Sequence, residues 1–484
     1  MSADFEVRHG DGAARLGELP VPGYDRSIET PALLPVINPN ITVLPAADIV
    51  AEFDPEALIT NAYVIYQSDE LRERALAGGV HGLLEVDLPV MTDSGSFQLA
   101  EYGSISVTND EIVRFQVDIG SNIVTPVDLP TPPDGSGEQA RQELQTTTDR
   151  IDEARELVGD EHLLSGPVQG GGHPQLRERA GREARGTDAD VYPIGAVVPL
   201  MEAYRFDDLV DTVIAAKRGL GPDVPVHLFG AGHPMMFTLA VALGCDLFDS
   251  AAYALYARDG RYLTPTGTYR VDDLDVLPCA CPVCVDHDTD DLAAGERLLA
   301  RHNLYVSFAE MRRIKQAIRQ GSLFELLDIR ARSHPDLLDG YRRLLEYDAY
   351  LERHDPSVKS TFMYVSAECA NRPEVYRHHW RLRDWRPEGD VLLAPEGVEV
   401  DGQFDARWEL VPPFGPVPPG LEHTYPLSAE LPERLDGSAY QQAVEGIRAL
   451  VQGSEDATYT LAHRDWPPSV LSDLPEEVET VLIE

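Results

Sequence analysis

The sequence predicts an α/β protein, a (β/α)8 barrel followed by a smaller C-terminal α+β domain, and three observations lead to this fold class. Eight short apolar runs recur between residues 31 and 253, amphipathic stretches alternate with them, and polar residues stand where the runs end. Continuous apolar runs of this length are typical of strands buried on both faces of a parallel sheet. Strand–helix alternation repeated about eight times is typical of a barrel.

The expected strands occupy eight segments, namely 31–37, 57–65, 89–95, 122–130, 163–170, 192–200, 224–232 and 245–253. Amphipathic helices are expected at 68–78, 138–157, 174–184, 204–219 and 234–243. An open, doubly wound sheet is the structural alternative. No GxGxxG motif follows the first run, which counts against a dinucleotide-binding fold of that kind.

Chemistry-bearing residues gather at the ends of the expected strands. They are Asn61, Asp93, Asp128, Gln169, Gly195, His227 and Asp249. In a barrel the carboxyl ends of all strands open on one face, which is the face where barrel enzymes carry their active sites. We therefore expect these residues to share one site.

After Leu255 the pattern changes. A cysteine cluster and a helical stretch occupy 262–330, and a segment rich in Trp, Pro and Arg begins near residue 360. We expect a catalytic domain at 1–360 that includes a metal-binding subdomain at about 262–310, and a C-terminal part at 361–484.

The charge balance is strongly acidic. The formal net charge is −42, and only three of the 40 basic residues are lysines. Self-repulsion of this size strains a compact fold in dilute buffer and is largely screened in molar salt. We interpret the composition as adaptation to a salt-rich cytoplasm, where an RNA partner is not excluded because counterion release contributes little. No long apolar run and no secretory signal stand in the sequence, so we expect a cytoplasmic protein without a membrane partner.

The five cysteines do not suit a disulfide scaffold, and three of them fall close together. Cys279, Cys281 and Cys284 can face one ion, and Zn²⁺ accepts thiolates tetrahedrally. His287 and His302 are the candidates for the fourth ligand. We favour His302, because His287 follows Cys284 tightly and a longer loop lets His302 close the tetrahedron. Four protein ligands predict one structural zinc ion. Cys245 and Cys369 are expected to be core residues.

Asp93, in MTDSGSFQ, and Asp249, in DLFDSAAY, form the second candidate constellation. Two carboxylates at a barrel mouth suit cleavage of a glycosidic bond, because one attacks the sugar carbon and the other moves protons. Each aspartate, taken alone, is also typical of a turn, where its side chain binds the nearby backbone.

Two further residues, Asp128 and Gln169, offer hydrogen bonds to the edge of a purine-like base. Gly195 and Ala196 let the backbone approach a planar ligand, and Phe97 is positioned to stack on it. Core packing is the alternative for Phe97. We interpret His227 and His233 as structural.

These motifs resemble the tRNA-guanine transglycosylases. TDSGSFQ, VDLPTPPD, PVQGG, IGAVVPLMEAYR, HLFGAGHP, DLFDSAAYALYAR and CACPVC followed by HN occur in the family's order over residues 10–330. The stretches FMYVSAECANRPEVYRH and PPFGPVPPGLEHTYPL resemble the archaeal branch and extend the coverage to about residue 425.

The resemblance implies a zinc-containing barrel enzyme, a pentosyltransferase that exchanges a base in tRNA. The archaeal branch removes guanine at position 15 of the D-arm and inserts 7-cyano-7-deazaguanine, the archaeosine precursor, through a covalent aspartyl–ribosyl intermediate. Asp249 matches the nucleophile of the bacterial branch and Asp93 the proton-transferring residue, although the TDSG aspartate has also been assigned as nucleophile in the archaeal branch. Asp128, Gln169, Gly195, Ala196 and Phe97 match the base pocket, and Cys279, Cys281, Cys284 and His302 match the zinc site.

Two departures refine the expectation. The bacterial pattern has a cysteine two residues after the pocket aspartate, and Pro130 stands there in this chain, which favours the archaeal ligand. Residues 426–484 leave no room for the family's full set of C-terminal domains, including an RNA-binding PUA domain, so a separate tRNA-binding chain or the barrel itself would hold tRNA. Relatives form homodimers.

A locally cationic segment at 371–386 is a candidate phosphate-contacting surface. It contains Arg372, Arg377, His378, His379, Trp380, Arg381, Arg383, Trp385 and Arg386. A solvated surface strand is the alternative. For the whole chain, the alternatives are a non-catalytic tRNA-binding paralogue and an archaeosine synthase-like protein. Both are disfavoured because Asp93, Asp128 and Asp249 stand in intact motifs.

Overall fold

The computed structural model describes residues 4–96, 107–454 and 456–483, and it divides into two compact units. Unit 1 comprises residues 1–10, 14–319 and 329–341, and unit 2 comprises 11–13, 320–328 and 342–484. The domain boundary expected near residue 360 stays a prediction. Across the described residues, no helix combines the length and the apolar character needed to cross a membrane.

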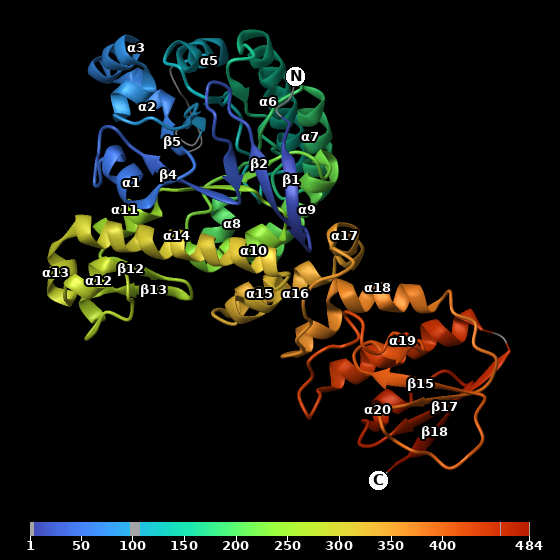
Figure 1. Cartoon of the computed structure of the whole chain (residues 1–484). Helices are drawn as coiled ribbons and strands as arrows, with labels where there is room; N and C mark the ends of the chain where they lie inside the picture. Colours follow the sequence, from blue (N-terminus) through green and yellow to red (C-terminus); the bar gives the residue numbers. More distant parts are fainter. Residues whose placement is uncertain (1–3, 97–106, 455, 484) are drawn as a thin grey trace. The chain divides into compact units, whose positions relative to one another are not determined.

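Unit 1 is built around eight parallel strands (Figure 1). They are β4 (Ala32–Ile37), β5 (Leu58–Asn61), β6 (Val90–Asp93), β7 (Ile123–Val124), β8 (Leu163–Leu164), β9 (Tyr192–Ile194), β10 (Val226–Leu228) and β11 (Leu247–Ser250). The order β8-β7-β6-β5-β4-β11-β10-β9 is closed by isolated parallel bridges Ser165–Val191 and Val168–Ile194. The expected barrel is therefore confirmed, and each predicted apolar run contains one of its strands.

Helices surround these strands. They are α1 (Ala46–Phe53), α2 (Ala62–Gln67), α3 (Asp69–Leu84), α5 (Asn109–Asp118), α6 (Gly137–Leu157), α7 (Pro174–Gly186), α8 (Val198–Glu202), α9 (Phe206–Leu220), α10 (Pro234–Ala242) and α11 (Ala252–Arg258). All five predicted helices are present. Sequence reasoning missed α5, which begins at a capping box between Thr108 and Glu111.

A three-stranded sheet, β1 (Glu6–Asp11), β2 (Ala14–Leu19) and β3 (Ile28–Thr30), was not predicted from the sequence. Leu19, Val21 and Ile28 belong to the same apolar cluster as Ala32, Leu163 and Leu247, which lie at or near the beginnings of barrel strands. The N-terminal segment therefore covers the end of the barrel where the strands begin. The site lies at the other end, where the strands finish.

Beyond the barrel, unit 1 carries the cysteine-containing segment. Its elements are β12 (Arg261–Thr264), β13 (Gly267–Arg270), the 3-10 turn η1 (Val271–Asp273), α12 (Pro282–Asp286), α13 (Thr289–Ala294) and the long α14 (Glu296–Gln320). Helices α15 (Leu323–Ala331) and α16 (Pro335–Leu345) follow, each with residues in both units.

Unit 2 contains a five-stranded mixed sheet and confirms a smaller, strand-rich C-terminal domain. Its elements are α17 (Asp348–His354), η2 (Ala367–Asn371), α18 (Pro373–Leu382), β14 (Gly389–Ala394), β15 (Ala406–Val411), β16 (Gly415–Val417), α19 (Gly437–Gly453), β17 (Ala457–His463), α20 (Pro468–Leu471) and β18 (Val478–Leu482). The order is β16-β15-β14-β17-β18, and only the β15–β16 pair is antiparallel. Apolar residues of α19, such as Ile447, pack with Trp408 and Leu461 of the sheet.

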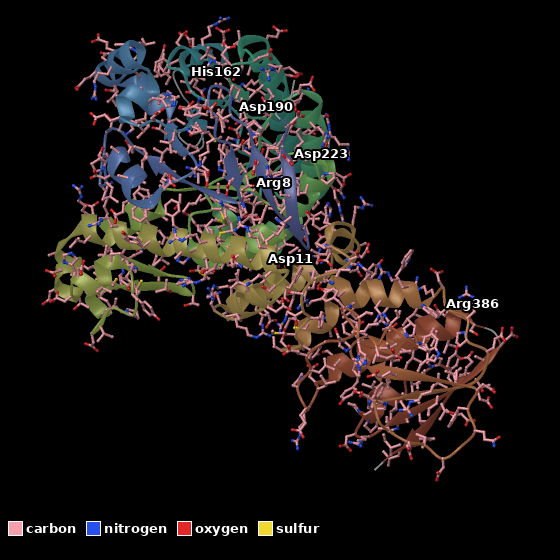
Figure 2. The ribbon with its side chains drawn as sticks, in the orientation of Figure 1. Arg8, Asp11, His162, Asp190, Asp223 and Arg386 are labelled. Carbon is pink, nitrogen blue, oxygen red and sulfur yellow. The ribbon has the colours of Figure 1, made fainter. Side chains whose placement is uncertain are left out.

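A buried ionic cluster lies inside unit 2, and we call it the Lys359 cluster. The Lys359 ammonium lies 2.9 Å from Asp11, 2.7 Å from Asp355 and 2.7 Å from Glu374. Two further cations complete it: Arg372 pairs with Glu374 and Glu325, and Arg377 pairs with Asp355. Figure 2 labels Asp11, the contribution of β1 to this cluster.

The cationic surface expected at 371–386 is therefore wrong for its first half. Arg372 and Arg377 are buried in ion pairs, and burial lowers the pKa of His378 to about 3 and that of His379 to about 4, so neither is charged near neutrality. Arg372 is the N-cap of α18, and Arg377 and His378 are buried residues of this helix. The exposed members of the segment are Trp380, Arg381, Arg383, Trp385 and Arg386, the last labelled in Figure 2.

Candidate active site at the carboxyl ends of the barrel strands

Asp93 is the last residue of β6. Its Oδ2 accepts a hydrogen bond of 2.8 Å from the side-chain amide of Asn61, which is its register partner at the end of β5. Burial, together with the negative charges of Asp128 and Asp249, raises the pKa of Asp93 to about 7. Hydrogen bonds from the main-chain amides of Gly95 and Ser94 lower the pKa and oppose this effect only in part. Asp93 can therefore hold or release a proton near neutral pH.

Asp249 lies at the end of β11 in a different environment. Its Oδ1 lies 3.0 Å from the Nε2 of His227 and accepts a hydrogen bond of 2.8 Å from the main-chain amide of Gly230. Because Asp249 raises the pKa of Asp93 through its charge, the two carboxylates share one electrostatic environment. The structure thus brings together the two aspartates that the sequence singled out.

Asp128 and Gln169 form a buried pair that is hydrogen-bonded through the two side chains. The amide of Gln169 donates a short hydrogen bond to Asp128 Oδ2, and Ser96 Oγ accepts from the main-chain amide of Asp128 at 3.0 Å. Burial raises the pKa of Asp128. The other amide atom, Gln169 Oε1, is buried and has no hydrogen-bond partner within the described chain, so it remains an acceptor for an N–H group.

Gly195 and Ala196 follow β9 and border this pair. A Cβ at Gly195 would collide with the side-chain nitrogen of Gln169, so any larger residue would displace that amide. Ala196 has a φ of +56°, in the left-handed region. The backbone at 195–196 is therefore held against the Asp128–Gln169 pair. Phe97 lies outside the described residues.

Arg177 of α7 supports this wall from behind and was not identified from the sequence. Its buried guanidinium donates to the carbonyl oxygens of Gly171, Val168 and Gly195 at 2.8, 2.8 and 2.9 Å. Burial lowers its pKa to about 9, while Asp128 acts in the opposite direction. An arginine on a predicted helix carries no sequence signal for such a role. Ser96, by contrast, lies in the TDSGSFQ motif, so the sequence did contain a signal for its place in the site.

A second group of side chains, Cys279, Cys281, Cys284 and His302, could hold a metal ion. Their ligand atoms all lie within 4.8 Å of one another. The Nδ1 of His302 lies 3.5 Å from Cys281 Sγ and 3.2 Å from Cys284 Sγ, while its Nε2 donates to the carbonyl of Leu263 at 3.0 Å. That second hydrogen bond leaves Nδ1 as the free lone pair, as metal-binding histidines require.

The geometry selects His302 over His287 as the fourth member of this group. His302 is fully buried and stacks on Tyr262 with ring centroids 3.7 Å apart. His287 instead faces Asp291, at 3.4 Å. Three thiols and one imidazole nitrogen match the donors that tetrahedral metals such as zinc accept.

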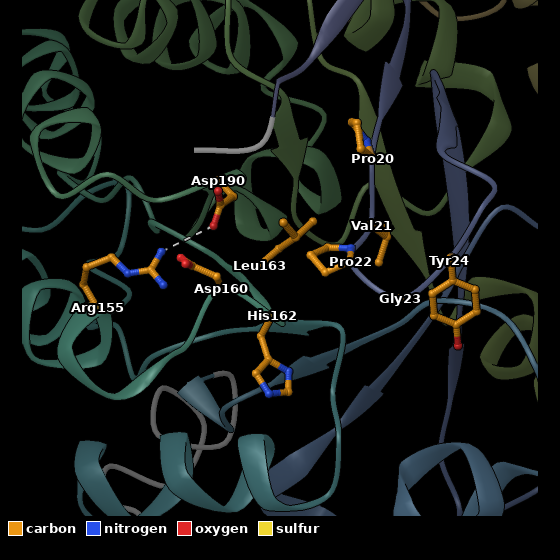
Figure 3. Close-up of a pocket in the computed structure, with 10 residues that line it drawn as sticks. All are labelled: Pro20, Val21, Pro22, Gly23, Tyr24, Arg155, Asp160, His162, Leu163 and Asp190. Carbon is orange, nitrogen blue, oxygen red and sulfur yellow. Dashed lines mark ion pairs between the residues drawn. The ribbon is translucent and has the colours of Figure 1, made fainter. Parts of the chain in front are cut away.

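A cavity at the opposite end of the barrel is separate from these residues (Figure 3). It has a volume of about 280 Å³ and is bordered by Pro20–Tyr24 and by Leu163, near the beginning of β8. Arg155 and Asp190 form an ion pair across its wall. Because it lies where the strands begin, it contains none of the predicted site residues.

Comparisons with known proteins agree with this geometry. The family model described as queuine tRNA-ribosyltransferase matches residues 11–336. A tRNA-guanine(15) transglycosylase of Haloferax volcanii is 58% identical over 484 residues, which cover 99% of this chain and 94% of that protein. Proteins of the same name from Haloarcula marismortui and Methanosarcina barkeri are 55% and 48% identical, over 98% and 95% of this chain and 98% and 94% of theirs.

Proposed function

This chain belongs to the queuine tRNA-ribosyltransferase family, and from that premise we propose that it replaces guanine at position 15 of tRNA with 7-cyano-7-deazaguanine. The family transfers ribosyl groups of tRNA, so the chain is a glycosyltransferase. The three relatives described above are all named as acting on guanine 15. The observation that carries the proposal is the grouping of Asp93, Asp128 and Asp249 at the strand ends.

We assign the nucleophile to Asp249. Gly230 and His227 hold its Oδ1 from two directions, and Oδ2 has no donor from the described part of the chain, so Oδ2 is the oxygen left to react. Oδ2 would attack C1′ of the ribose as the bond between C1′ and N9 of guanine breaks. The product is a covalent ester between Asp249 and the ribose.

Asp93 would move the protons. In the first half-reaction its carboxylic acid protonates the departing guanine, whose N9 takes the electron pair of the broken bond. In the second half-reaction its carboxylate removes the N9 proton of the incoming base, N9 attacks C1′, and Asp249 leaves. A pKa of about 7 suits both tasks, because the acid and the carboxylate are both populated near neutrality.

Base recognition falls to the Asp128–Gln169 pair. Asp128 would accept N–H groups from the Watson–Crick edge of the base, and the unpartnered Gln169 Oε1 offers a further acceptor. Gly195 and Ala196 bring the backbone close to a planar base, and Phe97 would stack on it. Cys279, Cys281, Cys284 and His302 would hold one structural zinc ion, which keeps the 262–310 segment folded.

The test uses unmodified archaeal tRNA and labelled 7-cyano-7-deazaguanine at high KCl. We expect label at nucleotide 15 and a covalent adduct that Asp249→Asn abolishes, with a loss of exchange on the order of 10⁴-fold. Asp223→Asn is the matched control, because this exposed aspartate pairs with Arg185 away from the strand ends, and it should exchange normally (Figure 2). Label at another nucleotide, or an adduct that survives in Asp249→Asn, contradicts the proposal.

The two half-reactions should respond to pH in opposite directions. Above about pH 7 the release of guanine in a single turnover slows, because Asp93 loses the proton that it must donate. Below about pH 7 the incorporation of base into the preformed adduct slows, because Asp93 is protonated and cannot accept one. Rapid-quench measurements on each half-reaction check this, and parallel pH profiles would reassign the proton-transfer role.

A further inference from the structure

His227 lies against the proposed nucleophile and has no role in the steps above. It belongs to β10, is fully buried, and approaches Asp249 with its Nε2 at 3.0 Å. Its other ring nitrogen, Nδ1, is buried without a hydrogen-bond partner among the described residues. We propose that His227 is a positioning residue, whose imidazole donates its Nε2 proton to Asp249 Oδ1 and so aims Oδ2 at the ribose. This inference rests on the proposed function.

The surroundings of the ring determine which nitrogen carries the proton. Asp249 Oδ1 is an acceptor, so Nε2 must donate to it. A second proton, on Nδ1, would bury an N–H without an acceptor, which costs about 1–3 kcal/mol in proteins. The ring is therefore a donor through Nε2, in a tautomer that its surroundings fix.

The backbone fixes the direction of this donor. His227 is in register with Leu247 in the β10–β11 pair, and Asp249 follows two residues later on the same side of the strand. The ring also packs edge-on against Phe229, with centroids 4.6 Å apart. Because the amide of Gly230 binds the same oxygen, the two donors together restrict rotation of the carboxylate about its last bond.

A role in proton transfer does not fit this ring. Nε2 is engaged with Asp249, Nδ1 has neither a donor nor an acceptor in the described chain, and no part of the side chain is accessible to solvent. His227 would thus act through Asp249 and never touch the base. Its removal should slow the attack on C1′ and leave tRNA binding intact.

Three variants test the proposal. His227→Phe keeps a ring and removes the donor, and His227→Gln restores an N–H at a similar reach. His162→Phe is the control, because it removes a partly buried histidine that binds the Ser121 carbonyl at the other end of the barrel (Figure 3). For His227→Phe we expect kcat and the single-turnover rate of adduct formation to fall about 100-fold, with KM for tRNA within about twofold. His227→Gln should regain at least about tenfold of that loss, and the control should stay within about threefold of the parent.

Each other outcome overturns the inference. A folded His227→Phe variant with an unchanged adduct rate shows that the donor is dispensable. A rise in KM alone makes His227 a substrate-binding residue, and a Gln variant no better than Phe makes its role one of packing.

A second measurement separates failure of the proposed function from failure of this inference. If the parent enzyme forms no adduct with tRNA, that function fails, and ¹⁵N shifts of the histidine rings, with His227 identified by its absence in His227→Phe, still test the tautomer. A ring protonated on Nε2 supports the hydrogen bond, and one protonated on Nδ1 overturns it.

Discussion

Two groups of carboxylates, one at the barrel mouth and one in unit 2, differ in their partners. At the barrel mouth, Asp93 contacts the Asn61 amide, Asp249 contacts His227 and the Gly230 amide, and neither carboxylate forms an ion pair with a lysine or arginine in the described chain. In the Lys359 cluster of unit 2, Asp11, Asp355 and Glu374 all contact the Lys359 ammonium. The same residue types thus meet opposite electrostatic environments.

The consequences appear in the protonation of the two groups. Burial raises the pKa of Asp11 and Asp355 even beside Lys359, whereas at Glu374 the charges of Arg372 and Lys359 outweigh burial and lower the pKa below the usual range. At Asp93 burial and two like charges act together, and the pKa reaches about 7. A carboxylate paired with cations is structural, whereas one left without them near neutrality is equipped for proton transfer.

The largest effect is expected from removing the central cation of unit 2. Lys359→Met leaves three carboxylates buried around an uncharged side chain, which should destabilise unit 2 by about 3–5 kcal/mol. All four tryptophans of the chain lie in unit 2, so their fluorescence during denaturation in high KCl reports on this unit alone. An unchanged unfolding midpoint would show that the cluster does not depend on Lys359.

A smaller effect, of opposite sign, is expected at the barrel mouth. The pKa of Asp93 is raised from 3.8 to about 7 on folding, so native protein binds more protons than unfolded protein between those values, and stability falls as pH rises through that window. Asp93→Asn removes this cost. It should stabilise the barrel by on the order of 2 kcal/mol at pH 8 and by little at pH 4, while abolishing base exchange.

Calorimetry at both pH values checks the expected stabilisation, with the unit 2 transition identified by tryptophan fluorescence. A variant that is equally stabilised at pH 4 and pH 8 would contradict the raised pKa of Asp93. A destabilised variant would show that its hydrogen bond with Asn61 outweighs the cost of the charge.

The smallest effect serves as the reference for unit 2. Arg448 and Glu445 form an ion pair on α19 in which each side chain is more than a third exposed. Arg448→Met should change the unfolding free energy of unit 2 by less than about 0.5 kcal/mol, because solvent screens exposed pairs. A loss as large as that of Lys359→Met would mean that burial does not distinguish the two clusters.

The barrel was predictable because its strands are buried on both faces. Runs such as PALLPVI at 31–37 and CDLFDSAAY at 245–253 reveal a parallel sheet without any knowledge of pairing. The β1–β3 sheet escaped prediction because its strands contain no continuous apolar run, and the mostly exposed β1 carries charged residues at several positions. Only long-range packing of Leu19, Val21 and Ile28 against the barrel makes it form.

The candidate site was likewise predicted in part. The order of the strand ends along the chain predicted that Asp93, Asp128, Gln169 and Asp249 would meet, and the spacing of the cysteines predicted the group completed by His302. The sequence placed His227 and Asp249 at the same face of the barrel, but their direct contact was not predicted, because His227 was interpreted as structural. A histidine at a strand end can pack against apolar side chains or donate a hydrogen bond, and the side chain opposite it on the neighbouring strand decides which. Local sequence does not determine which strands pair.

One further consequence concerns how the barrel is closed. The pairing between β8 and β9 consists of isolated bridges, and the Arg177 guanidinium binds a carbonyl on each side of that seam, Val168 and Gly195. Gln169 and Gly195 come directly after the bridged residues Val168 and Ile194. Arg177 thus links the two sides of this seam with one side chain, and under the proposed function a shorter residue at 177 would change which bases fit between Gln169 and Gly195 without changing the barrel itself.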